Sequence, residues 1–185
     1  FHGGNIESDD FKELLLRWFQ FGTFCPVMRI HGCRQPYTNL KNKAGEVREG
    51  TGADNEVWSY GEEAEKIMVK FIHVRELMKD YIRGIMKEAH EKGTPVMRTL
   101  FYEFPDDNCW DIYDEYMFGN EILVAPICHE HETRREVYLP KGHSWTSAHN
   151  GEVYEGGKTY NIDAPIDTIP VFLKDGSNKY LIGEI

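Results

Sequence analysis

The chain has 185 residues and a net charge of −10, and its apolar content of 41% approaches the globular norm of about 45 to 50% once glycine is included. At roughly 100 to 200 residues per domain, this length allows one domain or parts of two and excludes a complete eight-stranded α/β barrel of about 250 residues. The longest uncharged apolar run, 122–128, is far shorter than the roughly 18 residues of a spanning helix, and the acidic charge would repel a phosphate backbone. We therefore expect neither a membrane nor nucleic acid as a partner.

The first elements predicted are a helix and a buried strand. Apolar residues recur at helical spacing over 8–22, with Ser8 as the cap, and this stripe assigns Trp18 to packing. Residues 25–31 are typical of a short buried strand, in which Arg29 and His31 would share one face. Residues 32–58 are polar and rich in Gly and Asn, which predicts a long loop.

A long helix is predicted next, followed by short strands. Ser59 and Glu62 have the spacing of a capping box, and the apolar stripe after them ends before Gly93. Turn residues then separate six predicted strands, at 96–104, 121–127, 134–139, 152–154, 159–162 and 168–173. This spacing favours an antiparallel β-sandwich.

The cysteines show neither CxxC nor any other tight metal spacing, and a chain of this length does not need disulfides for stability. We therefore expect reduced thiols, a cytoplasmic location and no metal or other cofactor. The chain begins with Phe1 instead of Met, so the lack of a recognisable signal peptide carries no weight.

Two pairs of polar residues are candidates for chemistry. Arg29 and His31 precede a glycine and a long loop at the end of a predicted strand, where α/β barrels place binding residues, although a structural ion pair is an alternative. His129 and His131 would share a face if extended and are a candidate metal-binding pair, but no third ligand has matching spacing. A solvated connection is the better interpretation of that segment.

Aromatic residues give a further indication. Trp58 ends the long loop and is a candidate for stacking against the apolar face of a sugar. The adjacent carboxylates Asp106 and Asp107 follow a proline and are typical of a turn, so they do not indicate a catalytic dyad.

Ordered motifs extend over nearly the whole chain. They include FHGGN at 1–5, RWFQFG at 17–22, PVMRIHG at 26–32, NEVWSYG at 55–61, EFPDD at 103–107 and ILVAP at 122–126. Together they resemble glycoside hydrolase family 31, whose members are retaining α-glycosidases with a (β/α)8 barrel followed by β-sandwich domains.

The resemblance implies an α/β part followed by an all-β part. Residues 1–95 would be the end of the barrel, from the loop after strand seven through strand eight and helix eight. Residues 96–175 would be the proximal C-terminal β-sandwich, and 176–185 a short tail.

The resemblance also implies substrate-binding residues. His31, in the family's Arg-x-His motif, would hydrogen-bond sugar hydroxyls in subsite −1, and Arg29 would support that wall. Phe1, as the last residue of the family's Asp-Ile-Gly-Gly-Phe motif, and Trp58 are the other candidates. The parent protein would hydrolyse terminal non-reducing α-xylosyl or α-glucosyl residues, and which of the two it prefers stays open.

No catalytic residue is assigned within the chain. Retaining chemistry needs two carboxyl groups about 5 to 5.5 Å apart, and by this resemblance the family's catalytic aspartates lie upstream of Phe1. We therefore predict that the 185 residues alone are inactive.

The same interpretation gives the expected partners: an oligosaccharide or α-glycoside substrate and the missing N-terminal part of the enzyme. Association between copies of the chain is the alternative to that N-terminal part, because an unpaired strand would expose backbone donors. The alternative is a non-catalytic carbohydrate-binding or scaffolding β-sandwich module that binds through exposed aromatics such as Trp145 and Tyr154.

Overall fold

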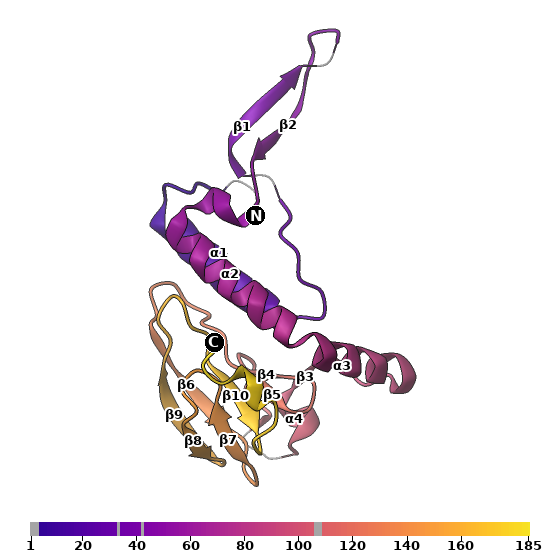
Figure 1. Cartoon of the computed structure of the whole chain (residues 1–185), viewed down its shortest axis with the longest axis vertical. Coiled ribbons are helices and arrows are strands. Elements are labelled where there is room, and N and C mark those ends of the chain that lie inside the picture. The colour runs from indigo at the N-terminus through magenta and orange to yellow at the C-terminus, as the bar shows by residue number, and fades with distance from the viewer. Residues whose placement is uncertain (1–3, 33, 42, 106–108) are drawn as a thin grey trace.

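The computed structural model describes residues 4–32, 34–41, 43–105 and 109–185. A β-hairpin, a group of helices and a β-rich region follow one another along the long axis of the molecule (Figure 1). Within the described ranges, no helix is both long and apolar enough to span a bilayer.

Helix α1 (Asp9–Thr23) begins as predicted. The Ser8 hydroxyl accepts a hydrogen bond from the Phe11 amide at 3.4 Å. Asp9 and Asp10 occupy the first turn, where carboxylates interact favourably with the helix dipole. Local capping chemistry therefore decides where this helix starts.

The buried face of α1 differs from the predicted stripe. Leu15 and Phe19 are buried, but Leu14 is 48% and Trp18 55% exposed, so the assignment of Trp18 to packing is wrong. The buried face instead includes Arg17, which a search for apolar periodicity does not count. Helix α1 therefore turns toward the core a face that includes polar as well as apolar side chains.

The predicted strand at 25–31 is absent. A strand needs a neighbour, and no described segment forms a β-ladder with these residues. The backbone around the start of this segment is instead held from α2 (Glu62–Leu77), where Arg75 donates to the carbonyls of Thr23 at 2.7 Å and Pro26 at 2.9 Å.

The predicted loop at 32–58 contains an antiparallel hairpin. Strands β1 (Arg34–Lys41) and β2 (Val47–Ala53) pair with each other and project away from the helices (Figure 1). The strands approach closely at Gly52, where a Cβ atom would lie 2.3 Å from the Arg34 carbonyl oxygen. The sequence lacks the apolar alternation that usually identifies a strand, so periodicity alone does not mark this hairpin.

The predicted long helix is two helices. After the 3-10 helix η1 (Val57–Tyr60), α2 is preceded by Gly61 and not by Ser59, so the predicted capping box is wrong. The chain changes direction at Met78, which is fully buried, and continues as α3 (Lys79–Lys92) (Figure 1). Gly93 ends α3 with φ 71°, which confirms the predicted C-terminus.

The remaining chain forms antiparallel sheets. The elements are β3 (Met97–Thr99), α4 (Leu100–Glu103), β4 (Tyr116–Phe118), β5 (Ile122–Val124), β6 (Arg134–Leu139), β7 (Ser144–Ser147), β8 (Val153–Glu155), β9 (Lys158–Asp163), β10 (Val171–Lys174) and η3 (Lys179–Leu181). One sheet has the order β3-β4-β5-β10-β7-β8, and β6 pairs with β9. Strands β4 and β7 were not predicted, and half of the predicted strand 96–104 is helix α4.

The six-stranded sheet is covered on both faces. Leu123 and Phe172 pack against Val137 of β6, while Ile122 and Leu173 pack in the core that contains Phe71 of α2. The described residues thus combine helices with antiparallel sheets and do not form a closed barrel.

Candidate functional site

Arg29 and His31 lie together, although they are not on a strand. Arg29 Nη2 lies 3.1 Å from His31 Nδ1, and both side chains are exposed. Because a guanidinium can only donate, Nδ1 must be the acceptor and the ring proton of a neutral imidazole is on Nε2. This tautomer presents an N–H donor of the kind that binds a sugar hydroxyl.

Hydrogen bonds connect the candidate segments at the base of the hairpin. The Gln35 amide donates to the Gly4 carbonyl at 2.9 Å, which joins the start of the described chain to β1. Asn55 Nδ2 donates to the Gly32 carbonyl at 2.7 Å, and Asn55 Oδ1 accepts from the Tyr60 hydroxyl at 2.7 Å. Residues before α1, the segment after His31 and the segment before α2 therefore meet at one point.

Arg34 is the buried centre of this region, with 3% of its surface exposed. It donates to the carbonyls of Asp54 at 2.8 Å and Ser59 at 3.1 Å, and its guanidinium lies 4.8 Å from the centre of the Tyr60 ring. Burial raises the pKa of Tyr60, and the nearby Arg34 charge opposes that rise. The phenol is therefore a stable hydrogen-bond donor.

The other two candidates are less defined. Trp58 is 63% exposed on η1, next to Ser59. Phe1 lies outside the described residues. Analysis of the sequence did not single out Arg34, Asn55 or Tyr60, although Asn55 and Tyr60 are part of the NEVWSYG motif.

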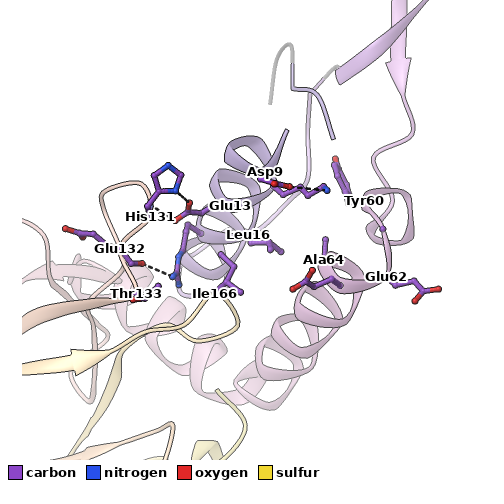
Figure 2. A pocket seen from close by; sticks show the side chains of 14 residues that line it. Asp9, Glu13, Leu16, Tyr60, Glu62, Ala64, His131, Glu132, Thr133 and Ile166 are labelled. Carbon is purple, nitrogen blue, oxygen red and sulfur yellow. Dashed lines mark hydrogen bonds and ion pairs between the residues drawn. The ribbon is translucent and has the colours of Figure 1, made fainter. Parts of the chain in front are cut away.

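A cavity of about 590 Å³ lies beside this region, between the start of α1, the start of α2 and the loop that contains His131 (Figure 2). His131 Nδ1 lies 3.1 Å from Glu13 Oε2, and Nε2 lies 3.6 Å from Asp10 Oδ1. His131 has φ 65°, so the segment is not extended as a metal-binding His129 and His131 pair would require. No group of three metal-ligating side chains was found in the parts of the chain that the structure describes.

The alternative, a carbohydrate-binding module, was expected to bind through exposed aromatics such as Trp145 and Tyr154, and this expectation is wrong for Trp145. Trp145 is fully buried, and its indole N–H donates to the Pro140 carbonyl at 2.9 Å. Tyr154 is half-buried and packs edge-on against Tyr160 at 4.9 Å. Trp145 lies in the buried part of β7, where Thr146 and Ser147 are buried as well.

Glu115 lies away from this region and has a carboxyl group with a strongly raised pKa. Burial raises its pKa to about 8, while the Tyr138 amide, which donates to Oε1 at 2.9 Å, and the Arg135 charge oppose the rise. The raised pKa favours the protonated form of this side chain at neutral pH.

Two domain families match the chain. The model described as "Glycosyl hydrolases family 31 TIM-barrel domain" matches residues 2–84, and the model described as "Glycosyl hydrolase family 31 C-terminal domain" matches residues 93–177.

The chain is also similar to proteins named alpha-glucosidase and alpha-xylosidase. Alpha-glucosidase 2 of Bacillus thermoamyloliquefaciens is 40% identical over 94% of this chain and 20% of its own length. Alpha-xylosidase of Saccharolobus solfataricus is 32% identical over 100% of this chain and 23% of its own length. The crystal structure of a GH31 alpha-xylosidase from a soil metagenome, complexed with xylose, has a TM-score of 0.93 and 44% identity, covering 98% of this chain and 28% of that one. The chain thus spans a fifth to little more than a quarter of these proteins.

Proposed function

Because this chain belongs to glycoside hydrolase family 31, we propose that it forms the closing part of a retaining α-glycosidase acting on terminal non-reducing α-xylosyl or α-glucosyl residues. Residues 1–95 complete the (β/α)8 barrel in this proposal, 96–175 form the proximal β-sandwich and 176–185 a tail. The packing of β6 against the six-stranded sheet supports the sandwich.

The exposed pair of Arg29 and His31 is the observation that carries the proposal. In the complete enzyme His31 Nε2 donates to a hydroxyl of the sugar in subsite −1, and Arg29 keeps Nδ1 as an acceptor. Trp58 and Phe1 contribute apolar surface for the sugar ring.

The remainder of the enzyme supplies the two catalytic carboxyl groups. One attacks the anomeric carbon to form a covalent glycosyl-enzyme, the other protonates the leaving oxygen, and water then releases the sugar. This chain contributes binding energy that holds the sugar ring in place during both steps.

The required partner is therefore the rest of the same polypeptide, and association between copies stays a prediction. We also propose a cytoplasmic location. It is supported by the described cysteines Cys25, Cys109 and Cys128, which are free thiols.

The test is His31→Ala in the complete parent enzyme, assayed with nitrophenyl α-xyloside and α-glucoside. We expect kcat/KM to fall about 10- to 100-fold, the cost of a hydrogen bond that strengthens in the transition state. His90→Ala is the matched control, because His90 is exposed on α3. Unchanged kcat/KM for His31→Ala would refute the proposed binding role.

A further inference from the structure

We propose that Asn55 and Tyr60 are positioning residues that fix the main chain immediately after His31, an inference that rests on the binding role proposed for His31. Neither residue is placed in contact with the sugar. They act through a sequence of three groups: the Tyr60 hydroxyl, the Asn55 amide and the Gly32 carbonyl.

The main chain after His31 needs an external restraint. Gly32 has φ 145°, a conformation that residues with a Cβ atom rarely adopt, and a glycine has no side chain to hold it. The hydrogen bond of 2.7 Å from Asn55 Nδ2 to the Gly32 carbonyl supplies that restraint. It fixes the carbonyl group of Gly32, the residue after His31, and so restrains the main chain from which the imidazole projects.

Tyr60 decides which way the Asn55 amide faces. An amide has a donor end and an acceptor end, and only the donor end can bind the Gly32 carbonyl. The Tyr60 hydroxyl donates to Asn55 Oδ1 at 2.7 Å, which leaves Nδ2 directed at Gly32. Tyr60 is only 2% exposed, which limits the access of water to this hydrogen bond.

Arg34 in turn holds Tyr60. Its guanidinium lies over the Tyr60 ring at 4.8 Å and donates to the Ser59 carbonyl at 3.1 Å, directly before Tyr60. The buried guanidinium of Arg34, and not a mobile loop, therefore supports the positioning residues. Supporting groups of this kind limit the motion of the groups that bind a ligand.

Two variants of the complete parent enzyme test the inference. Asn55→Asp keeps the shape of the side chain but removes the donor, and Tyr60→Phe keeps the ring that Arg34 covers but removes the hydroxyl. We expect kcat/KM to fall about 5- to 20-fold for Asn55→Asp and about 3- to 10-fold for Tyr60→Phe, mostly through kcat. Should Asn55→Asp not fold, Tyr60→Phe carries the test.

The matched control is Tyr180→Phe. The Tyr180 hydroxyl donates to Asn178 Oδ1 at 3.0 Å, so the control removes the same kind of hydrogen bond at the far end of the chain. We expect this variant to retain the kcat/KM of the parent enzyme.

A double-mutant cycle with His31→Ala separates positioning from general stability. If Asn55 acts through His31, Asn55→Asp and Tyr60→Phe lower kcat/KM in the parent enzyme but not further in the His31→Ala background. Equal falls in both backgrounds, or falls no larger than that of Tyr180→Phe, overturn the inference while His31 keeps its role. An unchanged kcat/KM for His31→Ala itself removes the proposed function and this inference with it.

Discussion

Arg17 Nη2 donates a hydrogen bond of 2.8 Å to the carbonyl of Ala164, 147 positions further along the chain. Arg17 also donates to the carbonyls of Thr168 at 2.9 Å and Glu132 at 3.2 Å. Two loops of the β-rich region, one between β5 and β6 and one between β9 and β10, are thus hydrogen-bonded to one side chain of α1, and Gln20 adds a bond of 2.6 Å to the Ile166 carbonyl. The helices and sheets are connected by charge-assisted hydrogen bonds as well as by their apolar core.

Replacing Arg17 by lysine should loosen this connection. An ammonium group keeps the charge but cannot reach carbonyls in several directions at once, so some buried carbonyls lose their donor. We expect the free energy of unfolding of the complete enzyme to fall by about 1 to 3 kcal/mol, measured by denaturant titration. Arg83→Lys, whose side chain is 69% exposed, should be neutral. Equal effects of the two variants would contradict this account.

Glu115 should make stability depend on pH. Its pKa of about 8 in the folded state exceeds its ordinary value of 4.5, so the folded state binds its proton more tightly than the unfolded state between these values. Its contribution to stability is therefore complete below pH 4.5 and is lost as the pH rises toward 8.

Glu115→Gln imitates the protonated form and keeps an acceptor for the Tyr138 amide. We expect the variant to match the parent enzyme in acid and to exceed its stability at alkaline pH by at least about 1.4 kcal/mol, the equivalent of one pKa unit. Thermal unfolding of the variant and of the parent enzyme, each at an acidic and an alkaline pH, measures this difference in stability. A stability difference that does not change with pH would exclude the proposed titration of Glu115.

Gly52→Ala should separate the strands of the hairpin. The added Cβ atom would lie 2.3 Å from the Arg34 carbonyl oxygen and 2.4 Å from its nitrogen, so the backbone must move. We expect faster hydrogen exchange of the β1 and β2 amides in the complete enzyme. Gly84→Ala is the control: it meets no atom within 4 Å in α3 and should stabilise by about 0.4 to 1 kcal/mol. Unchanged exchange in the hairpin would show that the strands accommodate the methyl group.

The isolated chain should release no measurable nitrophenol from α-xyloside or α-glucoside substrates. Retaining hydrolysis needs two facing carboxyl groups about 5 to 5.5 Å apart, and the proposal assigns both to the rest of the enzyme. Addition of the separately produced remainder is the positive control, and activity of the chain alone would contradict the assignment.

Local chemistry was readable from the sequence at two helix ends, although not at the start of α2, and distant partners were not readable. Ser8 and Gly93 mark helix ends through interactions within a few residues, and the sequence identified both correctly. The strand expected at 25–31 was wrong because a ladder depends on a neighbour that the described chain does not contain. Arg17 was missed because its acceptors lie on loops more than 100 positions away.

The candidate site, like the fold, was only partly predictable from the sequence. The two-residue spacing predicted that Arg29 and His31 lie together. The two side chains do contact each other, although the predicted strand on which that expectation was based is absent. Asn55 and Tyr60 carried no periodic signal, since their importance arises from one carbonyl at Gly32. Only their place within a recognisable motif marked them.

The hairpin is attached to the rest of the molecule at a single point, because Arg34 at its start pairs with Ala53 at its end. The polypeptide leaves and returns at neighbouring positions, so residues can be added to or removed from the tip without displacing Gly32 or Asn55. The two strands are thus a region whose length can change while the segment that carries His31 keeps its place.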